Sequence, residues 1–206
     1  MKKRDTIQLS FAALSLLLFI ILLLSPSSNF ILSTDSSVNS FLSTHQISFL
    51  ISLSKLTAYV FEPWMIVIFS LMFAIILFFS KLKKESYLLV ILTLLAGSFI
   101  YIIKETIQKA RPINALVQES SFSFPSGHSL ISLVFLGFLL YLALKNIKSK
   151  QKKTILSIIL IIIMLFAGAS RLILNVHWAS DVLSGWFLGL FILLASISLR
   201  NISCNK

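Results

Sequence analysis

Long apolar runs separated by short polar segments dominate this chain. Six of the runs are each close to the roughly 20 residues that an α-helix needs to cross a bilayer. The pattern therefore predicts an all-α, polytopic membrane protein with six transmembrane helices, at about residues 7–24, 63–79, 86–103, 129–144, 154–174 and 182–199. These spans leave no room for a separate soluble domain, so residues 1–206 are predicted to form a single integral-membrane domain.

Two segments allow other interpretations. The first apolar run follows Lys2, Lys3 and Arg4, as in a signal peptide, but its length of about 18 residues and the lack of a convincing cleavage site favour a span. The connection over residues 25–62 has apolar residues at roughly helical spacing, which predicts one short amphipathic helix in the membrane interface. We leave open whether this helix is a passive lid or guides a substrate. The apolar residues are Val38, Phe41, Leu42, Phe49, Leu53 and Leu56.

Composition agrees with the membrane interpretation. Hydrophobic residues make up 57% of the chain and charged residues 12%, against the usual 45–50% and about 25% of soluble domains. The mean hydropathy is +0.96. These values exclude a disordered chain, a disulfide-rich secreted module and an ordinary cytosolic enzyme. The single cysteine, Cys204, cannot form an internal disulfide; it is either a spectator thiol or a site of reversible lipid attachment.

The net charge of +11 does not indicate a nucleic-acid partner. Nucleic-acid binding needs a basic face with stacking aromatics, whereas here the cations lie in short clusters between apolar runs. If Met1 is cytoplasmic, 13 of the 18 Lys and Arg residues fall on the cytoplasmic side, which is the expected bias. The sequence thus predicts a multi-pass cell-membrane protein with Met1 and Lys206 both in the cytoplasm. The outer side receives Lys55, Lys104, Lys109, Arg111 and Arg171.

A first polar cluster follows the third span. Lys104 and Arg111 are seven positions apart, which on a helix places them within about 20° of one face. Pro112 is expected to end that helix. The cluster is either part of an anion site or a basic segment that only orients the span.

A second cluster, Pro125-Ser126-Gly127-His128, directly precedes the fourth span. Pro and Ser at a helix start leave backbone N–H groups free, and Gly127 lets a ligand approach the backbone closely. Such a helix N-terminus favours an anion, beside which His128 would project. Alternatively, His128 is only a cap or surface residue.

The third cluster connects the fifth and sixth spans and contains Ser170, Arg171, His177 and Asp181. His177 and Asp181 are four apart, so the carboxylate can accept a hydrogen bond from one imidazole nitrogen and leave the other free to react. Asp181 also suits the cap of the sixth helix. The predicted topology brings all three clusters to the same outer surface. The site there would combine three cations, a helix N-terminus and two histidines, which predicts that it binds a phosphate.

Together the clusters resemble the three-part signature of the type-2 phosphatidic acid phosphatase superfamily, or lipid phosphate phosphatases. The resemblance covers about residues 60–200 and is closest to the bacterial phosphatidylglycerophosphatase-like membrane branch. The superfamily also includes soluble haloperoxidases that bind vanadate, from which the six spans distinguish this chain. The matching positions are Lys104-x6-Arg111-Pro112, Pro125-Ser126-Gly127-His128 and Ser170-Arg171-x5-His177-x3-Asp181.

The resemblance implies catalytic roles for three residues. His177 would be the nucleophile that attacks phosphorus, Asp181 would orient it, and His128 would protonate the leaving group and then help to activate water. The remaining signature residues would hold the phosphoryl oxygens. The three cations would do so through their side chains, Ser126 and Gly127 through their backbone N–H groups, and Ser170 through its hydroxyl. These phosphate-binding residues are Lys104, Arg111, Arg171, Ser126, Gly127 and Ser170.

The implied reaction needs no metal and no other cofactor. The carboxylates expected near the site are only Glu105, Glu119 and Asp181. A magnesium-assisted phosphatase needs more carboxylates that are free to bind the ion. The implied substrate is a lipid phosphate in the outer leaflet, with phosphatidylglycerophosphate favoured and undecaprenyl pyrophosphate as the alternative. A non-enzymatic binder or transporter of anionic lipids would explain the cations but not the two histidines. The sequence does not specify the oligomeric state.

Overall fold

The computed structural model describes residues 3–26 and 28–203, and all regular structure within them is helical. This confirms the all-α prediction. The predicted sidedness of Met1 and Lys206, and the two interpretations of Cys204, concern residues outside those ranges. The helices are α1 Lys3–Leu24, α2 Asn29–Thr44, α3 Ser48–Val60, α4 Pro63–Phe79, α5 Lys83–Ile107, α6 Gly127–Asn146, α7 Lys150–Ile173 and α8 Ala179–Ser203.

Within the described ranges, five helices are long and apolar enough to cross a bilayer: α1, α5, α6, α7 and α8. A sixth candidate span is the pair α3 and α4, which meet at an angle of 53°. Helix α4 has only 17 residues and begins with Pro63 in its first turn, where a missing N–H costs nothing. The six predicted spans thus correspond to five continuous helices and one bent pair.

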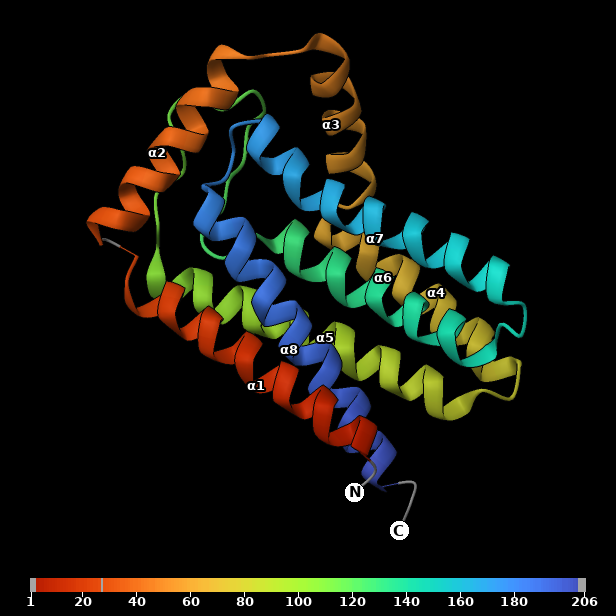
Figure 1. The fold of residues 1–206 in the computed structure, drawn as a ribbon. Coiled ribbons are helices and arrows are strands. Elements are labelled where there is room, and N and C mark those ends of the chain that lie inside the picture. The colour runs from red at the N-terminus through yellow and green to blue at the C-terminus, as the bar shows by residue number, and fades with distance from the viewer. Residues whose placement is uncertain (1–2, 27, 204–206) are drawn as a thin grey trace.

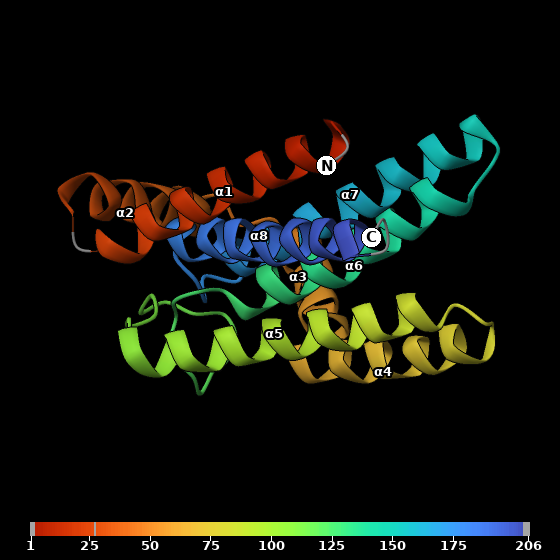
Figure 2. The same cartoon turned by 90° about the horizontal axis from the view of Figure 1, so that it is seen from below.

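The spans pack in layers around α6 (Figure 1). Helix α6 contacts α7 and α8 and also touches α4 and α5, which form one outer layer (Figure 2). Helix α1 packs along α8 on the opposite side. Buried residues of α5 and α6 form the centre of the core, because these helices have neighbours on several sides. Among them are Leu89, Leu92, Ala96, Leu130 and Phe138, all 0% exposed.

Helix α8 crosses very close to the first turn of α6. A Cβ atom at Gly185 would lie 2.6 Å from the backbone oxygen of Ser126 and 2.9 Å from the Cβ of Ser129. Real Cβ atoms essentially never come within 3.0 Å of another heavy atom, so only glycine fits this crossing. Gly185 therefore fixes the start of α6 against α8.

The connection over residues 25–62 differs from its prediction. Instead of one short helix it forms two, α2 and α3, joined near His45, and α3 belongs to the bent pair with α4. The residues of α2 that face the protein are Ile31 and the polar Asp35, and α3 packs against α7. The apolar spacing had merged residues of two helices into one face, so the predicted single helix is wrong.

The bundle has two distinct ends. In both views, α2 and the loop of residues 108–126 lie at one end, whereas the α4–α5 turn and the α6–α7 connection lie toward the other (Figures 1 and 2). At that other end, Glu85 of α5 accepts hydrogen bonds from Lys145 of α6 at 2.5 Å and Arg200 of α8 at 2.6 Å. All three polar sequence clusters lie at the first end.

Candidate active site

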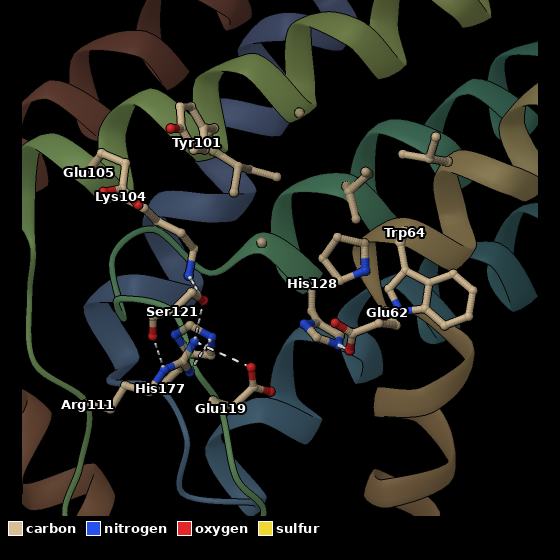
Figure 3. Close-up of a pocket in the computed structure, with 16 residues that line it drawn as sticks. Glu62, Trp64, Tyr101, Lys104, Glu105, Arg111, Glu119, Ser121, His128 and His177 are labelled. Atoms are coloured by element: carbon tan, nitrogen blue, oxygen red, sulfur yellow. Dashed lines mark hydrogen bonds and ion pairs between the residues drawn. The ribbon is translucent and has the colours of Figure 1, made fainter.

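A cavity of about 330 Å³ opens among α4, α5 and the start of α6 (Figure 3). Its apolar wall includes Trp64, Val67, Ile100 and Tyr101. The opposite wall is polar and comes from the loop of residues 108–126 and the α7–α8 connection. Five of the nine predicted site residues line this cavity: Lys104, Arg111, Gly127, His128 and His177.

Lys104 and Arg111 converge, but not on a helix face. Helix α5 ends at Ile107, and Gln108 adopts a left-handed conformation with φ of 50°, which turns the chain out of the helix. The predicted shared helix face is therefore wrong. The two cations meet because the loop folds back between them: Lys104 Nζ donates to Ser121 Oγ at 3.1 Å, and Arg111 Nε donates to the Ser121 carbonyl at 2.7 Å.

Glu119 bridges the two arginines. Its carboxylate lies 3.5 Å from Arg111 Nη2 and forms a close ion pair with Arg171, which is 1% exposed on α7. The Arg171 Nε is buried without a hydrogen-bond partner among the described residues. Two guanidinium groups thus share one carboxylate on the cavity wall.

His177 presents one ring nitrogen to Arg111 and the other to Asp181. Its Nε2 lies 3.2 Å from Arg111 Nη1, and its Nδ1 lies 3.5 Å from Asp181 Oδ2. Because a guanidinium N–H can only donate, Nε2 must carry the lone pair and Nδ1 the proton. Burial lowers the pKa of His177 to about 3, outweighing the raising effect of Asp181. The ring is therefore neutral, with its lone pair directed at the cations.

Asp181 is the centre of a buried polar network. Its carboxylate accepts hydrogen bonds from the Trp178 backbone N–H at 2.9 Å and from the Ser123 hydroxyl, and it pairs with Lys109 at 3.0 Å. The bond to Trp178 satisfies a free N–H at the start of α8, as in a capping box. Both roles considered for Asp181, the helix cap and the histidine contact, thus occur together.

Lys109 connects this network to α2. Its ammonium lies 3.1 Å from Asp35, which also accepts from the Ser180 backbone N–H at 2.8 Å. One cation therefore ties the outer helix α2 to the residue that contacts His177.

Helix α6 begins within the predicted cluster of residues 125–128. Ser126 is the N-cap, and its hydroxyl accepts from the Ser129 N–H at 3.4 Å. However, the backbone N–H of Ser126 donates to the Asp181 carbonyl at 3.0 Å and so is already engaged. His128 projects across the cavity from His177, with its Nε2 3.2 Å from Glu62 Oε2 and 3.1 Å from the Ala58 carbonyl (Figure 3).

Ser170 lies apart from the cavity. It is 0% exposed, and its hydroxyl donates to the Ala167 carbonyl within α7. The list of carboxylates near the site was also incomplete, since Glu62 and Asp35 join it from the 25–62 connection. No periodic pattern marks Glu62, Asp35 or Lys109, because their roles depend on how two loops and a helix break meet.

No three His, Cys, Asp or Glu side chains within the described ranges are grouped so that they could hold a metal ion. Glu119 and Asp181 already pair with cations. Independence from metal remains a prediction for a chelation experiment.

Comparisons with known proteins agree with this arrangement. Phosphatidylglycerophosphatase B of Bacillus subtilis (strain 168) is 37% identical over 93 residues, 44% of this chain and 46% of that protein, so the alignment spans less than half of the relative. The crystal structure of a transmembrane PAP2-type phosphatidylglycerolphosphate phosphatase from Bacillus subtilis superposes with a TM-score of 0.85 at 25% identity, covering 93% of this chain and 96% of that one.

The fold is also that of Aquifex aeolicus LpxE, with a TM-score of 0.64 at 20% identity over 83% of this chain and 96% of that one. Residues 86–203 match the PAP2 superfamily, and this region contains every signature residue of the cavity. That match covers more than half of the chain, and the bundle that carries it is shared over nearly its full length with a PAP2-type structure. The chain therefore belongs to the PAP2 superfamily.

Proposed function

We propose that this protein is a membrane lipid phosphatase that hydrolyses the phosphomonoester of a lipid phosphate through a phosphohistidine on His177. The observation that carries the proposal is the placement of His177, whose Nε2 lies 3.2 Å from Arg111 Nη1 and whose Nδ1 lies 3.5 Å from Asp181 Oδ2. Cations beside a nucleophile stabilise the equatorial oxygens of the phosphoryl group that it attacks. The apolar wall from α4 and α5 suits a substrate whose tails stay in the bilayer.

The phosphoryl group is bound by Lys104, Arg111 and Arg171. In this proposal the substrate phosphate exchanges with Glu119 between the two arginines. The backbone of Gly127 contributes from the N-terminus of α6. Ser126 and Ser170 would contribute only after leaving their present partners, the Asp181 and Ala167 carbonyls.

The reaction proceeds in two displacements. His177 Nε2 attacks phosphorus while the ester P–O bond breaks, and the leaving alkoxide takes a proton from His128. The Nδ1 proton of His177 stays directed at Asp181, whose carboxylate stabilises the positive ring. Water then attacks the phosphohistidine and gives its proton to His128, the P–N bond breaks, and inorganic phosphate leaves.

We favour phosphatidylglycerophosphate as the substrate. Support comes from the names of the two Bacillus proteins, a phosphatidylglycerophosphatase B and a phosphatidylglycerolphosphate phosphatase. A panel of phosphatidylglycerophosphate, phosphatidic acid and undecaprenyl pyrophosphate, each with purified protein in detergent, tests the choice. Fastest turnover of undecaprenyl pyrophosphate would contradict it.

We also propose that the active site faces outward and both termini lie in the cytoplasm. The described basic residues of the α4–α5 turn and the α6–α7 connection lie at the end of the bundle opposite the cavity, as the positive-inside rule requires. Cysteine substitutions in residues 105–123 and 145–153 can be labelled on intact cells with an impermeant reagent. Labelling of the second segment alone would contradict this orientation.

The mechanism is tested by trapping acid-labile phosphate on quenched enzyme. The parent protein should accumulate it and His177→Ala should not. His45→Ala is the matched control, because His45 is exposed between α2 and α3 and contributes nothing to the cavity. Acid-labile phosphoenzyme in His177→Ala would assign the nucleophile to another residue.

A further inference from the structure

The break between α3 and α4 supplies a carboxylate to His128. The His128 ring is 4% exposed, and Glu62 Oε2 and the Ala58 carbonyl both lie within 3.2 Å of its Nε2. Figure 3 shows Glu62 and His128 side by side, across the cavity from Lys104 and His177. This contact brings a residue from outside the signature to the second histidine.

Glu62 has no other evident structural task. It occupies the N-cap position of α4, but its side chain makes no capping hydrogen bond, and Glu is not a preferred N-cap residue. The carboxylate is 38% exposed into the cavity and is not required for core packing. Its contact with His128 is therefore the interaction that accounts for an acidic residue at this break.

The two acceptors fix the protonation pattern of the ring. A backbone carbonyl only accepts, so His128 Nε2 must carry a proton to satisfy Ala58. A neutral imidazole has one N–H, so its Nδ1 is then bare and can accept a proton but not donate one. To donate from Nδ1, the ring must first become a doubly protonated imidazolium. A buried cation of this kind requires a nearby anion.

We propose that Glu62 is a positioning residue that makes His128 a proton donor, by holding the Nε2–H tautomer and stabilising the imidazolium. The inference rests on the proposed phosphatase function. As the ester P–O bond breaks, its electron pair goes to the alkoxide oxygen, which takes the Nδ1 proton of His128. The ring is left neutral, with its remaining proton on Nε2 toward Glu62 and Ala58. In the second displacement, water returns a proton to Nδ1.

Other charges near His128 make this anion necessary. Arg171, from α7, forms an ion pair with Glu119, which lines the same cavity as His128. The cavity wall adds the cations Lys104 and Arg111, and Glu119 is already engaged with the arginines. Glu62 is the carboxylate that contacts His128 directly.

Glu62→Gln separates the two effects of the carboxylate. The amide oxygen can still accept from Nε2–H and keep the tautomer, but it provides no charge for the imidazolium. Turnover of a lipid phosphate, which has a poor leaving group, should fall by about 10²-fold or more, the lower range for general-acid catalysis. Turnover of p-nitrophenyl phosphate, whose leaving group needs no proton, should fall by less than about 3-fold on the same reasoning.

Two comparisons distinguish positioning from a merely structural role. In a His128→Ala background, Glu62→Gln should cause no further loss on the lipid substrate. Glu105→Gln, which removes the same charge from the α5 side of the cavity, should affect the two substrates equally. An equal loss on both substrates in Glu62→Gln, or an additive loss in the double variant, would overturn the inference.

The test of Glu62 and the test of His177 as the nucleophile can fail separately. If the parent protein forms no acid-labile phosphoenzyme, the proposed function fails. If it does form one, and Glu62→Gln does not discriminate between the two leaving groups, only the role of Glu62 fails. The thermal midpoint of Glu62→Gln, measured in the same detergent, checks that the variant is folded.

Discussion

Replacing Lys109 with methionine removes the only cation in direct contact with both Asp35 and Asp181 within the described residues. The ammonium lies 3.1 and 3.0 Å from the two carboxylates, whose side chains are 4% and 0% exposed. Methionine fills a similar volume but leaves both buried charges without this partner. We expect the variant to lose both stability and activity, because Asp181 also contacts His177.

The structure sets the size of the effect. At these distances and an effective dielectric constant of about 20, each ion pair is worth roughly 5 kcal/mol of attraction before desolvation is subtracted. Breaking a buried pair by removing one partner costs about 3–5 kcal/mol. At roughly 2–4 °C per kcal/mol for a chain of this size, the unfolding midpoint should fall by about 6–20 °C.

The assay is thermal unfolding in detergent at a fixed scan rate, since membrane proteins often unfold irreversibly. Lys55→Met is the matched control, because Lys55 is exposed on α3. Adding Asp35→Asn to Lys109→Met should reverse part of the fall in the unfolding midpoint. The second substitution removes one of the two unpaired charges and keeps an acceptor for Ser180. A midpoint shift no larger than that of Lys55→Met would refute this account of the network.

Three further predictions follow from other features. Gly185→Ala should lower both the unfolding midpoint and lipid turnover, because its Cβ would press on the Ser126 carbonyl at the start of α6; a midpoint equal to that of the parent would show that α8 shifts without cost. Because the pKa of His177 lies at about 3 in the folded protein and 6.5 when unperturbed, the unfolded state binds more protons between these values. Stability should therefore fall as pH drops from 6.5 toward 3, and the midpoint of His177→Gln should depend less on pH in that window. Phosphate release should survive EDTA with purified protein and defined lipid, and restoration of a lost activity by magnesium would contradict the mechanism.

The sequence predicted the elements whose signals are local. Apolar runs marked the spans, and Ser126 marked the start of α6, because hydrophobic length and capping are properties of neighbouring residues. The same reasoning failed for the helix face that Lys104 and Arg111 were predicted to share. Gln108 adopts a left-handed conformation and ends α5 before the helix reaches Arg111.

Residues that complete the site through tertiary contacts were not predictable in this way. Lys109 was counted as one of several basic residues, and Glu62 as the end of a loop. Their partners, Asp35 and His128, lie 74 and 66 positions away along the chain and reach them only after α2 and α3 have packed. A single sequence contains no periodicity that relates such positions.

The bridge that Glu119 makes between Arg111 and Arg171 also bears on turnover. The two guanidinium groups have a counter-ion before any substrate arrives, so the empty cavity does not hold two unpaired cations. An anion that binds both arginines exchanges with a carboxylate rather than with water alone, and its affinity is the difference between two sets of charge-assisted hydrogen bonds. In the proposed reaction, Glu119 thus competes with inorganic phosphate for the arginines, which limits product inhibition and favours release at the end of each cycle.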